Sequence, residues 1–477
     1  MRSTRGSGVC CRSDVAHQSN APEPIALLRR ELSSFGVLVL TLSCLSPVFC
    51  IYAVGTDVLL HAGTGAAGLF LFGVVSAAVW AVVYAELGSA YPYAGGDYVG
   101  VGSILGPWAG FASLAVWAVT AGPCIALSAK VIAVYVGELT STNAPNAFAF
   151  CSLIAAVAIA LLAVRTSALL TGLILGIELL AIVVLIWAGM RHPVRSLFDV
   201  LLHPVALNAS GALGAVSVAT LALGAVTATS ATAGGNQAIA FGEELRQPHR
   251  NMGRVILLAG LIGAIATALP VVVVTLGAAD LATLLKSPVP FSVFVSSVWG
   301  PLAGRALSAA VALAIFNSLI VLMMFYSRLF FSIGRDGILH RHVNRLLSGV
   351  HVPSGAPRGA TLVVGAFGGA CCPLDIHSLI IFFQGLAVYI LALVCFAVLV
   401  GRKRRLTGQV GHWRSPLYPL APLLGICLAL GFGVADLFDA DAGRPSVLLL
   451  GIVVIIAVLW HHFVLKRRPG GWSPRLG

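Results

Sequence analysis

The chain has 477 residues, of which 58% are apolar and only 10% are charged. Ordinary soluble domains carry about 25% charged residues, so this composition excludes that class. The formal net charge of +12 suggests either a nucleic-acid partner or basic flanks of membrane spans, and its distribution decides between them. We expect an all-α, polytopic membrane protein.

Apolar runs long enough to cross ~30 Å of hydrocarbon as helices recur along the whole chain. Twelve of them begin near Phe35, Ala66, Pro107, Ala147, Ala168, Leu213, Val255, Pro301, Gly359, Ile376, Leu417 and Ser446. The preceding residues 1–34 are polar, and no short apolar region with a small-residue cleavage site follows them. They are therefore interpreted as a cytosolic tail and not as a signal peptide.

The basic residues divide unequally between the two sides of such a bundle. If the first of twelve spans starts inside, 23 Lys and Arg fall on the cytoplasmic side and five on the other. This pattern is the positive-inside rule, and it predicts that both termini are cytosolic in a cytoplasmic (inner) membrane. The basic runs at 401–405 and 465–468 then flank spans and contact anionic lipid, so no nucleic-acid partner is expected.

The first span contains a predicted break. Pro47 lacks a backbone donor and cannot lie in mid-helix without loss, but it suits the first position of a new half-helix with Ser46 as its N-cap. We expect the helix to be interrupted at Ser46. The alternative is an ordinary kink in a packed helix.

The sixth span ends in AGGNQAIAFGEELRQPHRN, residues 233–251. Gly234 and Gly235 loosen the backbone, and Asn236 is expected to cap the segment that runs to Glu244. A break at membrane depth persists only where it lines a cavity. We therefore expect the binding cavity here, with a valine at Gly235 filling it, although glycines also serve close helix packing.

Both outgoing half-helices would direct their positive N-terminal ends at this cavity, while the carbonyl ends of the preceding halves also face it. A carboxylate suits the first and an ammonium the second, so a zwitterionic α-amino acid fits both. The predicted substrate-binding residues are Ser46, Pro47, Val48, Gly234, Gly235, Asn236 and Gln237.

Charges inside the spans are costly and are seldom retained without use. Glu178 lies near the middle of the fifth span, where loss of water disfavours its charged form. It is the candidate for proton coupling, with a structural hydrogen bond to a neighbouring helix as the alternative. Asp57 and Lys130 lie in the outer parts of their spans, where they are expected to reach the interface or to pair with each other. Glu86 is interpreted as part of an inner gate or a structural pair.

Four segments, in order and in place relative to the spans, resemble signature regions of the amino acid, polyamine and organocation (APC) permeases. They are AELGSAYPYAGGDYVGVGSILGPWAGF, GEELRQPHRNMGR, SRLFFSIGRDGILH and GHWRSPLYPLAPLLG. The resemblance extends from about Leu27 to the last helix. It implies a LeuT-like core of two five-helix halves with inverted topology, in which helices 1 and 6 are broken. The chain would then divide into a cytosolic tail (1–34), a ten-helix transport core (35–400), helices 11 and 12 with the preceding basic loop (401–465) and a second cytosolic tail (466–477).

The same resemblance implies secondary transport of an amino acid or amine. Where many members carry a GSG-like triplet in helix 1, this chain has Ser46, Pro47 and Val48. Where members often have a glycine, an aromatic and an acid in helix 6, it has Gly234, Gly235 and Asn236, which suggests a roomier pocket. Proton-coupled members can carry a lysine in helix 5, and here Glu178 would have to serve.

These features predict an importer that works by proton symport. Sodium coupling, exchange and transport of polyamines remain alternatives within the fold, and a non-transporting amino acid receptor is the alternative from another class. The chain contains no HExxH, GxSxG or P-loop motif and no cysteine spacing typical of a metal site, so no enzyme, cofactor or resident metal is expected.

Overall fold

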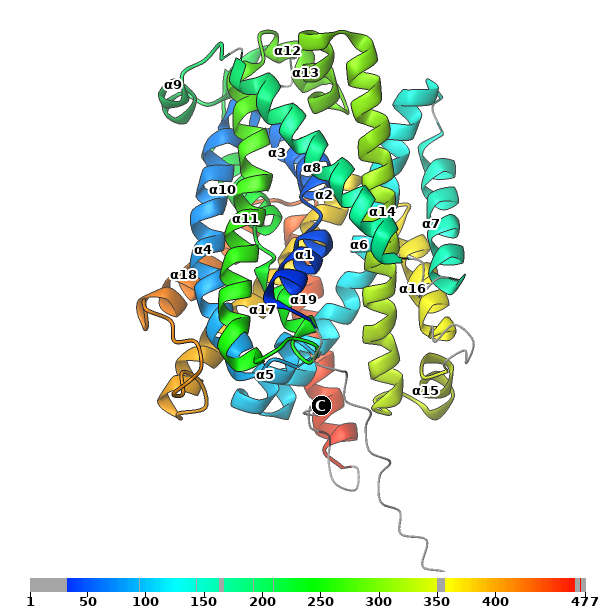
Figure 1. Cartoon of the computed structure of the whole chain (residues 1–477), viewed down its shortest axis with the longest axis vertical. Helices are drawn as coiled ribbons and strands as arrows, with labels where there is room; N and C mark the ends of the chain where they lie inside the picture. The colour runs from blue at the N-terminus through cyan, green and yellow to red at the C-terminus, as the bar shows by residue number, and fades with distance from the viewer. Residues whose placement is uncertain are drawn as a thin grey trace, which may run out of the picture.

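The computed structural model describes residues 32–93, 95–142, 144–162, 167–191, 193–208, 210–349, 357–467 and 472. The cytosolic tails predicted at 1–34 and 466–477 lie almost entirely outside these residues. The body is a bundle of helices (Figure 1). Its long helices are α4 (Ala66–Ala90), α6 (Pro107–Thr140), α7 (Pro145–Leu162), α8 (Ser167–Arg191), α10 (Val218–Thr232), α11 (Pro248–Gly277), α14 (Pro301–Arg335), α16 (Arg358–Cys371), α17 (Ile376–Lys403), α18 (Leu420–Asp436) and α19 (Gly443–Trp460).

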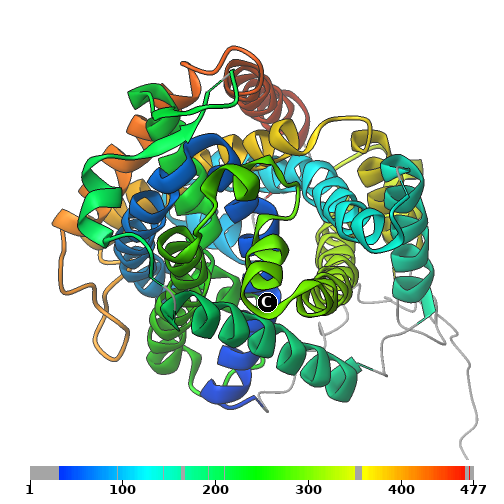
Figure 2. The ribbon, with the colours of Figure 1, turned by 90° about the horizontal axis from the view of Figure 1, so that it is seen from above.

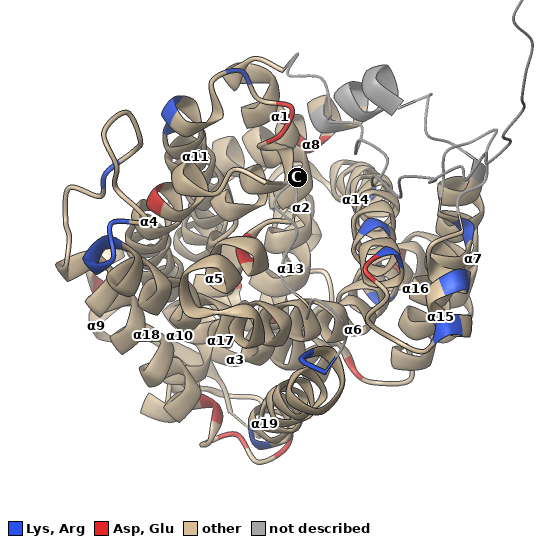
Figure 3. Cartoon of the chain, turned by 90° about the horizontal axis from the view of Figure 1, so that it is seen from below, with Lys and Arg blue, Asp and Glu red and all other residues tan. Residues whose placement is uncertain are grey.

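The first apolar run is divided into several helical pieces. They are α1 (Ser34–Leu45), α2 (Pro47–Phe49), the π-helical η1 (Cys50–Gly55), α3 (Thr56–Ala62) and the short η2 (Gly63–Gly65). The view from below places α2 near the middle of the surrounding helices (Figure 3). Val48 and Ile51 are accordingly fully buried.

Short helices cover the two ends of the bundle (Figure 1). At the lower end lie α5 (Asp97–Leu105) and α15 (Arg341–Leu347), and at the upper end lie α9 (Leu197–Leu202), α12 (Leu281–Lys286) and α13 (Pro290–Trp299). The 3₁₀-helix η3 (Gly235–Phe241) follows α10, and the π-helical η4 (His461–Leu465) follows α19. The positive-inside pattern predicts that the lower end faces the cytoplasm.

All twelve predicted apolar runs contain helix. Within the described residues, seven helical segments are long and apolar enough to cross a membrane, and the first of them, Ser34–Ala90, contains both the first and the second run. The chain is therefore an integral membrane protein. The count of twelve spans and the inverted repeat stay predictions.

A β-hairpin near the upper end of the bundle, the end predicted to face outwards, is a feature that the all-α prediction missed. β1 (Val205–Leu207) pairs antiparallel with β2 (Leu213–Ala215). The sixth span was expected to begin near Leu213, but α10 begins at Val218, behind a cap in which the Ser217 Oγ atom accepts a hydrogen bond from the Thr220 amide at 3.1 Å. The Asn208 side chain closes the hairpin by accepting hydrogen bonds from the amides of Ser210 and Ala212, so local turn chemistry overrides the apolar pattern.

The hairpin is fastened over the outer end of the first span. The Thr64 Oγ1 atom accepts a hydrogen bond from the Val205 amide at 2.9 Å. Gly63 has φ +54°, and a Cβ atom there would lie 2.0 Å from the Val205 carbonyl oxygen, so only glycine fits this contact. Figure 2 shows this outer face of the bundle from above.

At the opposite end the two broken spans are joined through their backbones. The Leu32 amide donates to the Glu244 carbonyl at 2.9 Å, and the Arg246 amide donates to the Leu32 carbonyl at 3.1 Å. The residue that precedes α1 is thus bonded to the segment that follows η3. The two inner half-helices therefore form one connected unit.

Glu86, at the inner end of α4, is fully buried and pairs with Arg402 at the end of α17. The Arg402 guanidinium donates to both carboxylate oxygens, at 3.0 Å from Nε and 2.6 Å from Nη2. The Thr407 hydroxyl and the Ser415 amide also donate to this carboxylate, each at 3.0 Å. A bidentate pair with two further donors satisfies the buried charge. Glu86 therefore holds the basic loop after α17 against α4.

Candidate functional site

The first span breaks at the predicted residue. α1 ends at Leu45, Ser46 adopts a left-handed conformation (φ 40°, ψ 77°), and Pro47 begins the next helix. The Ser46 Oγ atom accepts a hydrogen bond from the Phe49 amide at 3.4 Å, which is the expected N-cap. Ser46 is only 2% exposed, so the break lies inside the protein.

A second serine contacts this break from a distant part of the chain. The Ser318 hydroxyl on α14 donates to the Ser46 Oγ atom at 2.6 Å. We did not single out Ser318 from the sequence, because isolated serines in apolar helices usually bond their own backbone. Its Oγ atom also lies 3.1 Å from the Ala314 carbonyl oxygen, so the local pattern conceals the long-range contact.

The second break differs from the prediction. α10 ends at Thr232, and η3 starts at Gly235 with Gly234 as its cap. Asn236 is the second residue of this 3₁₀-helix and does not cap it. The tight i→i+3 turn is closed by the backbone, because the Gln237 amide donates to the Gly234 carbonyl at 3.1 Å. The Asn236 side chain is therefore left available for other contacts.

Gly235 lines the cavity, but its lack of a side chain is also needed for close packing of η3 against α11. A Cβ atom at Gly235 would lie 2.5 Å from the Ile256 carbonyl oxygen and 3.0 Å from the Gly260 Cα atom, both in α11. Valine at Gly235 was expected to fill the cavity. It would also collide with the backbone of α11, which cannot yield as a side chain can, so this variant does not test the cavity alone.

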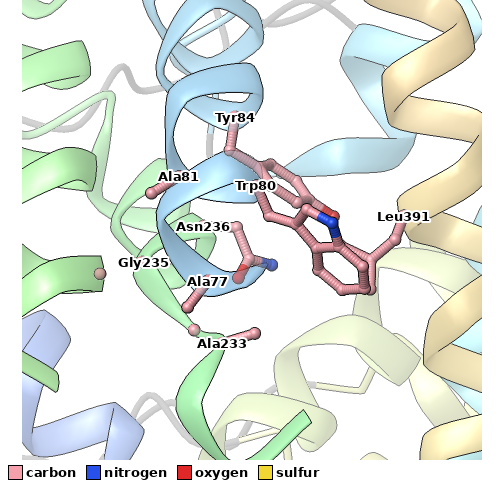
Figure 4. Close-up of a pocket in the computed structure, with 10 residues that line it drawn as sticks. Ala77, Trp80, Ala81, Tyr84, Ala233, Gly235, Asn236 and Leu391 are labelled. Carbon is pink, nitrogen blue, oxygen red and sulfur yellow. The ribbon is translucent and has the colours of Figure 1, made fainter. Parts of the chain in front are cut away.

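A small internal cavity of about 20 Å³ lies beside the second break (Figure 4). It is lined by Ala77, Trp80, Ala81, Tyr84, Ala233, Gly234, Gly235, Asn236, Gly260 and Leu391. In Figure 4 the Asn236 side chain lies beside Trp80 and below Tyr84. Space for one water molecule takes about 10–15 Å³ and ligand pockets usually hold 300 Å³ or more, so the cavity is closed in this conformation.

In the described part of the chain, Ser46, Pro47, Val48 and Gln237 do not line this cavity. The Leu45 side chain packs against the second break, because a Cβ atom on Gly234 would approach its Cδ2 atom to 2.0 Å. Leu45 is also the last residue of α1, directly before Ser46, so it adjoins both breaks.

Asp97 is a buried carboxylate of this region that the sequence reasoning missed. It begins α5, is 5% exposed, and accepts a hydrogen bond from the Tyr84 hydroxyl at 3.2 Å. Asn236 and Trp117 also face it, and burial raises the pKa of Asp97 to about 6. Its signal was an acidic residue inside the otherwise uncharged stretch GGDYVGVG.

Glu178 lies on α8, which packs against α2, α11 and α14. It is 2% exposed, and among the described residues its Oε2 atom has no hydrogen-bond partner. It lies within electrostatic range of Cys50, in the outgoing half of the first span. A buried carboxyl oxygen without a partner is unfavourable for the charged form and suits a group that carries a proton.

Asp57 and Lys130 do not pair with each other within the described residues. The Lys130 ammonium donates to the carbonyls of Cys372 and Leu374, at 3.1 and 2.6 Å. Asp57 is 8% exposed and contacts His377 instead, with its two carboxylate oxygens 3.0 and 3.1 Å from the Nδ1 atom. The alternative of a mutual ion pair is therefore wrong.

Comparison with known proteins agrees with this geometry. A family model described as amino acid permease matches residues 32–464 of the chain. The chain belongs to the amino acid permease family. This permease is 29% identical to uncharacterized transporters of Mycobacterium bovis and of Mycobacterium tuberculosis over 437 residues, which cover 89% of the chain and 90% of each relative.

Family and relatives thus show that the permease is a membrane transporter and indicate no enzyme. Their match spans both broken helices and the inner loop that contains Arg402. The resemblance inferred from the four sequence segments is confirmed.

Proposed function

We propose that the permease imports a zwitterionic amino acid across the cytoplasmic membrane by proton symport with alternating access. The observation that carries this proposal is the meeting of two interrupted spans around Leu45, beside a closed internal cavity. Interrupted helices expose backbone donors and acceptors inside the protein, where a charged substrate can replace water as their partner. Membership in the amino acid permease family supports the substrate class.

The carboxylate of the substrate would lie at the first break. The helical segment 47–62 begins there. Pro47 has no N–H, the Phe49 amide is capped by the Ser46 side chain, and the Cys50 amide donates to the Ser46 carbonyl, so among the described residues the Val48 amide is left for an anion. The partial positive charge at the start of this segment favours an anion. The ammonium would lie at the second break, where the last carbonyls of α10 and the Asn236 side chain are available.

Binding requires the cavity to widen from its present volume. The side chain of Leu45 packs against Gly234 and Leu45 precedes Ser46 in the chain, so its displacement would join the space beside Gly234 to the surroundings of Ser46, Pro47 and Val48. The backbone bonds between Leu32 and the segment after η3 would carry the inner half-helices together during this opening. The substrate would then contact both halves of the predicted site, with Gln237 at its edge.

Proton coupling is assigned to Glu178. Its partnerless oxygen lies on a helix that packs against α2, so a change in protonation alters the field at the segment that must move. Asp97 is a second buried carboxyl group, nearer the predicted cytoplasmic side than Glu178. Its carboxylate already accepts a hydrogen bond from the Tyr84 hydroxyl. We therefore interpret Asp97 as a support for Asn236.

Uptake into proteoliposomes tests the function directly. Purified permease should concentrate at least one amino acid when an inward proton gradient is imposed, and this accumulation should disappear when an ionophore collapses the gradient. A panel of amino acids and polyamines identifies the substrate. Uptake that needs sodium or an internal counter-substrate would replace proton symport by one of those modes, and binding without any flux would favour the receptor.

The orientation is tested separately by reporter fusions. A cytoplasm-specific reporter fused after residue 477 should be active, and the same reporter fused to the loop after β1 should be inactive. The expectation rests on the 23 basic residues of the predicted cytoplasmic side. A C-terminal reporter active only outside the cytoplasm would overturn the orientation and the count of twelve spans together.

A further inference from the structure

Three side chains with metal-ligating atoms meet at the outer end of the bundle, away from the cavity. Asp57 and His61 lie one turn apart on α3, and His377 lies in the first turn of α17. One ligating atom from each falls within 4.8 Å of the others. The side chain of His61 is 53% exposed, whereas that of Asp57 is 9% exposed. The cluster therefore has a buried carboxylate and an imidazole that solvent can reach.

The distances between these atoms match those in a small tetrahedral ion site. The Nδ1 atoms of His377 and His61 lie 3.0 and 3.4 Å from the Asp57 Oδ1 atom. Around a Zn²⁺ ion with bonds of about 2.0–2.1 Å, neighbouring ligand atoms of a tetrahedron lie roughly 3.3–3.4 Å apart. Small side-chain adjustments would therefore allow three protein ligands to bind one ion, leaving a fourth position for water.

The charges around the cluster favour a cation. Asp375 and Asp439 lie within electrostatic range of His377, in addition to Asp57 itself. A polar hollow of about 110 Å³, lined in part by His61, Asn208 of the hairpin and Ser217, the cap of α10, adjoins the cluster. An ion can thus approach from the outer surface through this hollow.

The chemical type of the three ligands indicates which metal ions the cluster would bind. Two imidazoles and one carboxylate suit Zn²⁺ and other late divalent transition metals, whereas Ca²⁺ and Mg²⁺ prefer oxygen ligands. Without metal, the His61 Nδ1 atom lies 2.8 Å from the Asp57 backbone carbonyl oxygen, to which it can donate a proton. Metal binding would require both rings to carry their proton on Nε2.

We propose that Asp57, His61 and His377 form a Zn²⁺ site that joins the outer ends of α3 and α17. α3 is the outer part of the first broken span, so a bound ion holds this part against α17. If the proposed transport function holds, external Zn²⁺ therefore inhibits uptake by restraining the first broken span, which must move during alternating access.

Isothermal titration of the purified full-length permease with Zn²⁺ tests the site without reference to transport. One binding event should be lost or weakened at least about tenfold in His61→Gln and in His377→Gln, because each removes one of three ligands. The matched control is the double variant His340→Gln/His342→Gln, a second pair of neighbouring imidazoles whose ring centroids lie 5.3 Å apart at the lower end. It should leave that event unchanged. His61 is half exposed, so its variant is expected to fold, as size-exclusion chromatography can verify.

Equal Zn²⁺ affinity and stoichiometry in the wild type and in folded His61→Gln would overturn the proposal. The second measurement is uptake in proteoliposomes with Zn²⁺ added outside. Inhibition of the wild type that is relieved in His61→Gln supports the joining of α3 to α17. If Zn²⁺ binds at these residues but does not inhibit measurable uptake, the proposal that the ion restrains α3 against α17 is overturned, while the metal site itself stands. Absence of any uptake without Zn²⁺ contradicts the proposed function, while the titration still decides the site.

Discussion

Replacing Glu178 with glutamine is expected to abolish accumulation driven by a proton gradient, while substrate affinity stays within about tenfold, or ~1.4 kcal/mol. Glutamine keeps the size of the side chain but cannot ionise, so the transport cycle loses its proton and not its packing. The measurements are concentrative uptake at several pH values, counterflow of labelled substrate without a gradient, and equilibrium binding in detergent. Counterflow should continue in the variant because it needs no net proton movement.

Asp97→Asn is the matched control for this experiment. It neutralises a second buried carboxyl group, but one that already accepts a hydrogen bond from Tyr84. Accumulation by this variant should keep its dependence on the gradient. Wild-type pH dependence in Glu178→Gln would show that Glu178 is structural, and loss of coupling in Asp97→Asn alone would move the proton site to Asp97.

The substrate class gives the second large effect. An amino acid should compete for uptake roughly 30- to 150-fold better than the amine formed by its decarboxylation, a difference of ~2–3 kcal/mol. The amine leaves the Val48 amide at the start of segment 47–62 facing no anion. Competition curves for matched pairs of amino acid and amine against one labelled substrate measure the ratio. Polyamines that outcompete every amino acid would overturn the carboxylate assignment.

Two adjacent residues with amide side chains, Asn236 and Gln237, offer a matched pair of variants for the same assay. Asn236 lines the cavity, whereas in the described part of the chain its neighbour Gln237 does not. Asn236→Leu should lower uptake at least about tenfold through the loss of one or two hydrogen bonds, and Gln237→Leu should have a much smaller effect. The reverse order would place the substrate on the other side of η3. These variants are preferable to Gly235→Val, because a valine at that position would collide with the backbone of α11.

The first break could be predicted because its cause is local. Pro47 removes a backbone donor wherever it lies, and Ser46 before it supplies the cap, so two neighbouring residues determine where α1 ends. The second break was located but its geometry was not predicted. Gly235 is held by contacts with Ile256 and Gly260, about 20 residues further along the chain, and no local pattern distinguishes a capped α-helix from the 3₁₀-helix that these contacts allow.

For the charged residues, too, features with a local cause could be predicted and features that depend on distant contacts could not. An intramembrane carboxylate such as Glu178 stands out in an apolar span, so its burial could be predicted. The partners of Asp57 could not be predicted, because His377 is 320 residues away and its first-turn position on α17 carries no unusual pattern. Asp97 was missed for a related reason, since its contact with Asn236 depends on how α5 folds back against the second break.

The closed volume beside Asn236 also affects how binding constants should be interpreted. A substrate cannot enter a space of about 20 Å³, so in the opening proposed above it binds only to molecules in which Leu45 has moved. The measured dissociation constant is then the intrinsic one divided by the fraction of open molecules, and an open population of about 1% weakens it about a hundredfold. A smaller side chain at position 45 that raises this population would therefore tighten apparent affinity without adding any contact to the substrate.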